Sequence, residues 1–303
     1  MDDFERIVRD IKAINIQGAE SVAIASVRAL ACRFSNSKAK SCRILLCELD
    51  NSKRELFATR PTEPLMRNAL NYITSSLVAG SKDVVKLRKD FSRARAEALA
   101  HMEKAQEAIA EEAAKKIKSG MIIFTHCHSS TVMRILKKAK QQGKRFEVYN
   151  TEARPLFQGR KMAQELSKAG IKVTHFVDSA ASVALAKCDV AFIGFDALTS
   201  DGVYNKIGSG MFASVASEHK LPLYVCGDAW KYDADNLRGK GEGVECRSPK
   251  EVWPAAPRGV KVANPCFELI RPDMISGVIS ELGAHKHGEF IRRVKKAYPW
   301  LSR

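Results

Sequence analysis

The stretch MIIFTHCHSSTVMRILKKAKQQ, residues 121–142, decides the fold. It opens with a short apolar run, 121–126, and continues from Ser130 to Gln142 with apolar residues at helical spacing. A buried strand that leads directly into an amphipathic helix is the repeating unit of a parallel sheet covered by helices. The stretch therefore predicts an α/β fold.

The same alternation continues toward the C-terminus and predicts a Rossmann-like, doubly wound, mainly parallel sheet. Residues 230–257 lack periodicity and are expected to form a long loop, whereas residues 272–300 have a helical pattern. Further strands are expected in FEVYN (146–150), KVTHFVD (172–178), VAFIGFD (190–196), LPLYVCG (221–227) and VKVANP (260–265), and helices over 130–142, 159–169, 179–186 and 209–219.

Residues 3–119 show only helical patterning, with amphipathic stretches at 19–32, 62–77 and 84–118. Gly120 follows the last stretch in the position expected of a helix C-cap. We therefore expect two domains. Residues 1–119 form an N-terminal helical domain, and residues 120–303 form a Rossmann-like α/β domain that carries most of the ligand pocket.

The composition narrows the classes of function. A net charge of +16 fits anionic substrates, acidic protein partners, nucleic acid or a charged solvated surface. Nucleic acid is the weakest of these, because the basic stretches lack interleaved aromatic residues. The eight cysteines form no CxxC pair, which argues against zinc and fits a reducing, cytoplasmic environment. The apolar runs are all shorter than the ~18 residues that a membrane span needs, so we expect no membrane segment.

Ligands of open α/β sheets gather at the carboxyl edge of the strands, so polar residues that follow strands are candidates for the site. Cys127 follows the first strand and lies near a helix N-terminus, where the helix dipole favours a thiolate. Asp196 ends the strand 190–196. From spacing alone, a cysteine at this place is more often an inert buried thiol, and an aspartate at a strand end caps a turn about as often as it does chemistry.

Several motifs resemble one known family. NTEARPLFQGRKMAQEL (150–166), GFDAL (194–198), DGVYNKIGS (201–209) and THCHSS (125–130), with IQGAE (16–20) and TRPTEP (59–64), resemble initiation factor two-B alpha, beta and delta subunits, methylthioribose-1-phosphate isomerase and archaeal ribose-1,5-bisphosphate isomerase. The resemblance implies that Cys127 and Asp196 form a catalytic pair and that no metal or organic cofactor takes part. It implies substrate contacts at Gly18, Ala19, Arg60, His128, Ser129, Gln158, Asn205, Lys206 and Lys231.

Two departures from the isomerase pattern keep two hypotheses open. Gln17 stands where the isomerases have an arginine, and Ser130 where the bisphosphate enzymes have a lysine. The first hypothesis is an isomerase of ribose 1,5-bisphosphate in nucleotide salvage. The second is a regulatory subunit that binds sugar phosphates or nucleotides without turnover and contacts a translation-initiation GTPase. Either would be a homodimer or a higher homo-oligomer. Cations that could replace the two missing charges are Lys231, Arg154, Arg160 and Arg67.

Overall fold

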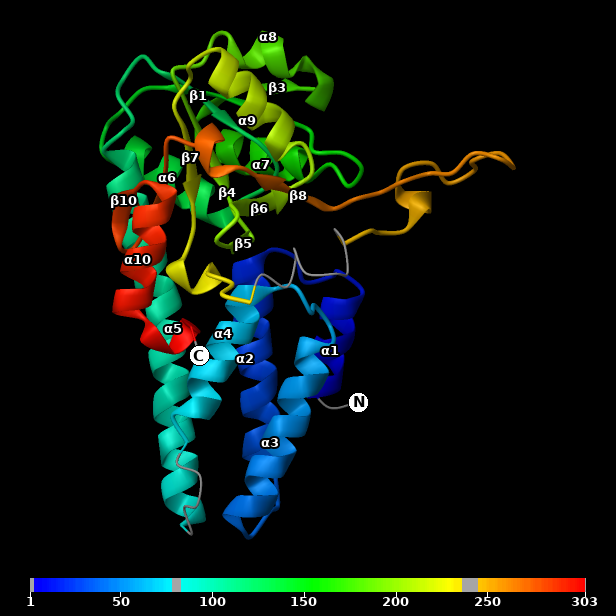
Figure 1. Ribbon diagram of the computed structural model, residues 1–303, viewed down its shortest axis with the longest axis vertical. Helices are drawn as coiled ribbons and strands as arrows, with labels where there is room; N and C mark the ends of the chain where they lie inside the picture. Colours follow the sequence, from blue (N-terminus) through cyan, green and yellow to red (C-terminus); the bar gives the residue numbers. More distant parts are fainter. Residues whose placement is uncertain (1–2, 78–82, 236–244, 303) are drawn as a thin grey trace. The chain divides into compact units, whose positions relative to one another are not determined.

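The computed structural model describes residues 3–77, 83–235 and 245–302 (Figure 1). The chain divides into two compact units, one that runs through Lys104 and one from Ala105 to Ser302. The division falls inside the long helix α5 (Val84–Ala114), whereas the sequence placed the domain boundary after residue 119. The last turns of α5 belong with the second unit because Ile109 and Ala113 are buried in the core around its sheet.

The first unit is a helical bundle in which α2 packs against α1, α3 and α4 and stacks Phe34 on Phe91 of α5. Its core includes the fully buried side chains of Phe4, Leu30, Leu45 and Leu70. Local signals fix the helix starts, since Ser41 accepts a hydrogen bond from the backbone of Ile44 as an N-cap. Besides the start of α5, the helices are α1 (Asp3–Lys12), α2 (Ala19–Asn36), α3 (Cys42–Phe57) and α4 (Pro64–Ser75).

The second unit is built on a seven-stranded sheet with the order β10-β9-β7-β4-β1-β2-β3 (Figure 1). Every neighbouring pair is parallel except β9 and β10, which form an antiparallel hairpin. The predicted α/β fold class is confirmed. The strands are β1 (Ile122–Thr125), β2 (Glu147–Thr151), β3 (Lys172–Phe176), β4 (Val190–Gly194), β7 (Leu223–Cys226), β9 (Gly277–Ser280) and β10 (Gly283–His285).

The strand order contains a topological switch point. The chain runs outward from β1 through β2 to β3, then returns to pair β4 with the opposite side of β1. The loops that follow β1 and β4 therefore diverge, and the crevice between them is where sheets of this class bind ligands. The helices of this unit are α6 (Ser130–Gln141), α7 (Gln158–Lys168), α8 (Ala181–Leu185), α9 (Ser209–Glu218) and α10 (His287–Ala297), with the 3-10 turn η1 (Asp178–Ala180) before α8.

A second, antiparallel sheet of three strands was not predicted. It consists of β5 (Ala197–Leu198), β6 (Val203–Lys206) and β8 (Phe267–Ile270), with β6 in the middle. β5 and β6 lie in the connection between β4 and α9, whereas β8 comes from the segment between β7 and β9. The central strand of the small sheet ends in Asn205 and Lys206, so it sets the position of two of the predicted substrate contacts.

Two predicted elements are wrong. Residues 260–265 do not form a strand of the main sheet, because Pro265 makes only an isolated bridge with Cys246. Residues 272–300 are not helical throughout: 277–285 form β9 and β10, and the helix starts only at His287. The strand Gly277–Ser280 is buried along its whole length, so it lacks the alternation that marks a half-exposed strand.

The predicted long loop, residues 230–257, contains two short 3-10 turns, η2 (Ala229–Lys231) and η3 (Pro249–Glu251). Residues 236–244 of that prediction lie outside the described residues. Within the described parts of the chain, no helix combines the length and apolar character needed to cross a membrane.

Candidate active site

Cys127 lies two residues after the end of β1, with a left-handed backbone φ of 63° and partial exposure to solvent. Ser129, two residues on, caps α6 by accepting a hydrogen bond from the Val132 backbone N–H at 3.3 Å. The end of β4 passes very close to this cap. A Cβ on Gly194 would lie 2.6 Å from the Ser129 hydroxyl oxygen, so only glycine lets β4 approach the start of α6.

Asp196 lies two residues after the end of β4, where the chain crosses into the small sheet. Its backbone N–H donates to the Tyr204 carbonyl at 2.9 Å. Because β1 and β4 are paired and parallel, Cys127 and Asp196 follow neighbouring strands at the same edge. The two residues therefore flank the switch point.

Electrostatic interactions link the predicted residues around the sulfur. Burial raises the pKa of the Cys127 thiol to about 11, and the Lys206 ammonium and the His128 backbone N–H oppose this rise. The carboxylates of Asp196 and Asp178 raise the pKa further. At neutral pH the sulfur is therefore a protonated thiol in this state. The sequence analysis expected the helix N-terminus to favour a thiolate, whereas burial of the sulfur favours the neutral thiol.

Asn205 and Lys206 are held by a short chain of hydrogen bonds at the end of β6. The Asn205 amide donates to the Ser209 hydroxyl at 2.8 Å, and that hydroxyl donates to the Lys206 carbonyl at 2.7 Å. Both side chains are buried. These bonds fix the backbone from which the lysine side chain extends.

Two residues of this region were missed by the sequence argument. His126, fully buried, bonds through its two ring nitrogens to Thr151 and Ile207. Asp178, just after β3, accepts hydrogen bonds from the backbone N–H groups of Ala153 and Arg154 at 2.9 and 2.8 Å. Asp178 could have been found, since it ends the predicted strand 172–178. His126 carries no comparable signal, because its partners are distant in sequence.

Lys231 is buried beside Asp196. Its ammonium donates to the carbonyl oxygen of Phe195 at 2.6 Å, so it supports the backbone that presents Asp196. The ammonium also lies 5.3 Å from the centre of the Phe195 ring. Lys231 therefore contacts a protein group, whereas the sequence analysis expected it to contact only the substrate.

Gln158 is the first residue of α7, and His128 lies two residues before α6. The Gln158 side-chain oxygen is buried and has no hydrogen-bond partner among the described residues. The Thr125 hydroxyl, at the end of β1, is also buried and has no hydrogen-bond partner within the described ranges. A ligand hydroxyl could satisfy such atoms. His128 instead contacts the Glu165 carboxylate at 3.2 Å.

Three predicted contacts belong to the first unit. Gly18 precedes α2 with a left-handed φ of 85°, and Ala19 is the first residue of that helix. The backbone N–H groups of the first turn lack partners within the helix, as an anion site requires. Arg60 lies half-buried between α3 and α4. Gln17, at the position of the family arginine, donates to the Ile14 carbonyl at 2.9 Å.

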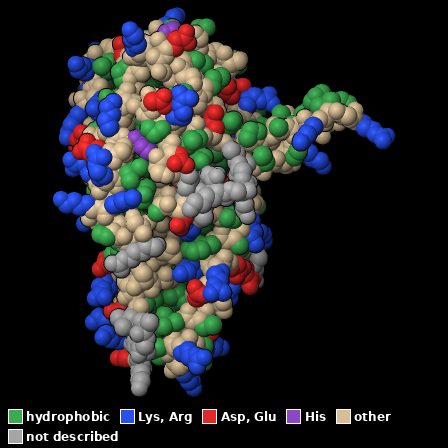
Figure 2. Space-filling model, viewed as in Figure 1, with side chains coloured by type: hydrophobic (Ala, Val, Ile, Leu, Met, Phe, Trp, Pro, Cys, Tyr) green, Lys and Arg blue, Asp and Glu red, His purple; other side chains and the backbone are tan. Residues whose placement is uncertain are grey.

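The other candidate replacement cations contact protein groups. Arg160 pairs with Glu152 at 3.2 Å. Arg154 donates to the Val252 carbonyl at 3.4 Å, and Arg67 to the Pro61 carbonyl at 3.2 Å. On the face shown in Figure 2, basic side chains are spread out and interspersed with acidic ones. This distribution fits a solvated surface better than a nucleic-acid groove.

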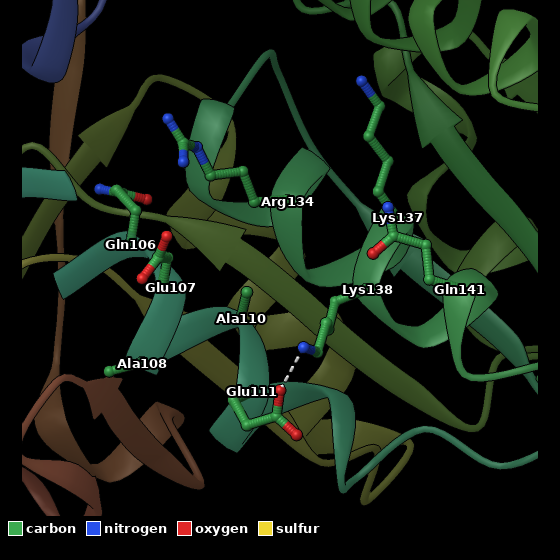
Figure 3. A pocket seen from close by; sticks show the side chains of 9 residues that line it. All are labelled: Gln106, Glu107, Ala108, Ala110, Glu111, Arg134, Lys137, Lys138 and Gln141. Carbon is green, nitrogen blue, oxygen red and sulfur yellow. Dashed lines mark ion pairs between the residues drawn. The ribbon is translucent and has the colours of Figure 1, made fainter. Parts of the chain in front are cut away.

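A hollow of about 610 Å³ lies between the end of α5 and α6, and it contains none of the predicted site residues (Figure 3). An ion pair of 2.5 Å between Lys138 and Glu111 crosses it. Its walls mix both signs of charge. They are formed by Gln106, Glu107, Ala108, Ala110, Glu111, Arg134, Lys137, Lys138 and Gln141.

This architecture matches a known family. Residues 15–287 match the initiation factor 2 subunit family, and the chain belongs to that family. Among its relatives, the ribose 1,5-bisphosphate isomerase of Pyrococcus furiosus is 34% identical, over 97% of this chain and 94% of the relative. The methylthioribose-1-phosphate isomerase of Pelotomaculum thermopropionicum is 30% identical, over 94% and 83%.

Solved structures agree with this assignment. The 5-methylthioribose 1-phosphate isomerase of Pyrococcus horikoshii superposes with a TM-score of 0.83 at 25% identity, covering 97% of this chain and 88% of that one. The translation initiation factor eIF-2B of the same organism gives 0.81 at 26% identity, covering 94% and 98%. The family thus contains proteins named as isomerases and proteins named as translation factors.

Proposed function

We propose that the chain is an aldose–ketose sugar-phosphate isomerase that converts ribose 1,5-bisphosphate to ribulose 1,5-bisphosphate. One observation carries the proposal: Cys127 and Asp196 follow the two strands that flank the switch point, with Lys206 close enough to lower the pKa of the thiol. The relatives that are named ribose 1,5-bisphosphate isomerase, at up to 34% identity, support the choice of substrate.

The chemistry of such a substrate explains why a thiol and a carboxyl are both needed. The anomeric oxygen of an aldose 1-phosphate is blocked, so the ring must open before hydrogen can move between C2 and C1. Asp196 donates a proton to the ring oxygen and later takes the proton of the C2 hydroxyl. The Cys127 sulfur takes the proton from C2 and returns it to C1. Lys206 stabilises the negative charge that develops on oxygen.

The protonated resting thiol fits this scheme. Transfer of its proton to the Asp196 carboxylate produces both the thiolate base and the carboxylic acid. The pair then needs no proton from solvent. Lys206 favours the charged sulfur, because its ammonium lowers the pKa of the thiol.

Backbone amides supply the phosphate contacts in this proposal. The helix α6 starts directly after Ser129, next to the end of β4, and the backbone N–H groups at a helix N-terminus favour a bound phosphate. They compensate in part for the charges absent at Gln17 and Ser130. The protein would act in the cytoplasm, in nucleotide salvage, as a homodimer or larger homo-oligomer.

A second candidate is a regulatory subunit of translation initiation that binds a sugar phosphate or nucleotide in the same pocket without turnover. The Gln17 side chain favours it, since its amide is engaged with the Ile14 carbonyl and replaces a cation of the isomerases. The structural likeness to the eIF-2B protein of Pyrococcus horikoshii also favours it.

The test is turnover of purified protein with ribose 1,5-bisphosphate, followed as appearance of ribulose 1,5-bisphosphate, with methylthioribose 1-phosphate as the rival substrate. Asp196→Asn is the negative control. Product from the first substrate alone supports the proposal. Calorimetric binding without product, together with capture of a translation-initiation GTPase, would favour the regulatory subunit. Turnover of the rival alone would overturn the substrate assignment.

A further inference from the structure

We propose that His126 is a positioning residue: its hydrogen bond to the Ile207 carbonyl sets the place of Lys206 relative to Cys127. The kinetic consequence rests on the proposed function, while the structural consequence does not. His126 immediately precedes Cys127, and Ile207 immediately follows Lys206. A single side chain thus joins the two backbone segments that carry the sulfur and the ammonium.

The hydrogen bonds define one tautomer of the ring. Nε2 lies 2.9 Å from the carbonyl oxygen of Ile207, and a carbonyl can only accept. Nε2 therefore carries the proton. Nδ1 then accepts a hydrogen bond from the Thr151 hydroxyl, at 2.7 Å. Both nitrogens are used, so the ring is fixed in orientation and links β1, β2 and the loop between β6 and α9.

Packing leaves the ring no alternative place. His126 is 1% exposed, and its ring centre lies 4.7 Å from that of Phe212. Gly208, with a left-handed φ of 101°, passes so near that a Cβ there would be 3.1 Å from Nε2. The loop that follows Lys206 is therefore shaped around the imidazole.

The imidazole acts as a neutral group. Burial lowers its pKa to about 4, and the Lys206 ammonium lowers it too, although the Ile207 bond and the Asp178 carboxylate oppose this. Asp178 lies 3.9 Å from Nδ1, but its two oxygens accept from the backbone N–H groups of Ala153 and Arg154. His126 therefore holds geometry near neutral pH and carries no proton in the reaction.

The opposite side of the same loop is held by Glu268, whose carboxylate accepts from the backbone N–H groups of Gly208 and Gly210. Lys206 thus sits in a segment that is fixed from two sides. Without the His126 bond, the loop would keep its hydrogen bonds to Glu268 and Ser209 but would lose its link to the segment that carries Cys127. The ammonium would then lose its defined position beside the sulfur.

Two substitutions of His126 separate the roles of its two ring nitrogens. The side-chain amide of His126→Gln can reach the place of Nε2 and still donate to Ile207, whereas that of His126→Asn reaches the place of Nδ1 and loses this bond. We expect kcat to fall by less than about 5-fold in the glutamine variant and by about 100-fold in the asparagine variant, since misplacement of about 1 Å costs that much. KM should change less than kcat in both.

Thr151→Val is the matched control, because it removes the Nδ1 bond and leaves the Ile207 bond. It should lower the melting temperature while kcat stays within about 3-fold of that of the unchanged protein. This loss of kcat is at least an order of magnitude smaller than the loss of about 100-fold expected from misplacement of the lysine. Equal losses of kcat in the glutamine and asparagine variants, or losses that follow the melting temperature across all three, would overturn the proposal.

Hydrogen exchange tests the inference without any assay of activity. The backbone amides of residues 206–210 should exchange faster in His126→Asn than in the unchanged protein, and at an unchanged rate in His126→Gln. If the protein turns over no sugar phosphate, the proposed function fails while this measurement still decides the role of His126. Equal exchange in the two variants would refute that role.

Discussion

The ammonium group of Lys206 lowers the pKa of the Cys127 thiol, against the burial that raises it to about 11. Lys206 ends β6, the central strand of the small antiparallel sheet, and Cys127 follows β1 of the seven-stranded sheet. The proposed active site is therefore assembled from both sheets. Neither sheet alone would place an acid, a base and a cation around one crevice.

Replacing Lys206 with methionine should raise the pKa of the Cys127 thiol further, because a cation that favours the thiolate is removed. The measurement is the pH dependence of alkylation at Cys127, followed by mass spectrometry of the peptide that contains it. Lys187→Met, at an exposed position, is the control. A thiol that titrates at the same or a lower pH in the Lys206 variant would contradict the electrostatic coupling.

Replacing Cys127 with serine should lower kcat by about 10²- to 10⁴-fold, the usual contribution of a group that transfers a proton. A serine hydroxyl is a far weaker acid than a thiol and would not form the base. Binding of the sugar phosphate, measured by calorimetry, should stay within about 10-fold, a change of about 1.4 kcal/mol. Cys47→Ser, on an exposed free cysteine, should have full activity. An active Cys127→Ser protein would refute the proposed role of the sulfur.

Replacing Gly159 with alanine should destabilise the fold by more than about 3 kcal/mol, because the new methyl group cannot be accommodated. A Cβ there would lie 1.7 Å from the carbonyl oxygen of Thr151, at the end of β2. Gly288→Ala is the matched control, since it is also the second residue of a helix and its Cβ would meet no atom within 4 Å. Urea unfolding measures both. Similar midpoints for the two variants would contradict the close approach.

Stability should fall as the pH rises above about 9, because buried thiols keep their protons longer in the folded than in the unfolded chain. Burial raises the pKa of Cys226, and that of Cys266 to about 11. The stabilisation is complete below the unfolded pKa and is lost as the pH rises toward the folded pKa. Cys226→Ala should make the fall shallower, by up to about 1.4 kcal/mol per pH unit.

The control for the pH experiment is Cys47→Ala, because the exposed Cys47 should leave the slope unchanged. The free energy of unfolding is measured by urea titration from pH 8 to pH 11. A cavity in the Cys226 variant lowers the free energy of unfolding by the same amount at every pH, so it does not change the slope of that free energy against pH. Identical slopes for the Cys226 variant and the unchanged protein would show that this thiol titrates alike in both states.

Much of the second unit could be predicted from local patterns. The strand and helix over 121–142 carry their own signals, and the positions of Cys127 and Asp196 follow from where two predicted strands end. The hairpin at 277–285 could not be predicted in this way. Its first strand is buried on both faces and is only four residues long, so it shows no alternation that separates it from the helical pattern expected for residues 272–300.

The chemistry of the site was harder to predict than its location. The helix N-terminus beside Cys127 is visible in the sequence, but the depth of burial that dominates the pKa of the thiol is set by tertiary packing. The same is true of His126, whose contact with Ile207 spans 81 positions. Whether Lys231 supports the Phe195 backbone could be learned only from the structure.

The hairpin of β9 and β10 also bears on how the protein is made. The strand β7 pairs on one side with β4 and on the other side with β9, residues 277–280, which are synthesised late. Until then a nascent chain displays an open apolar strand edge, the kind of surface that recruits chaperones or neighbouring chains. A chain that ends before Gly277 would therefore leave this edge of β7 unpaired, as a surface prone to aggregation.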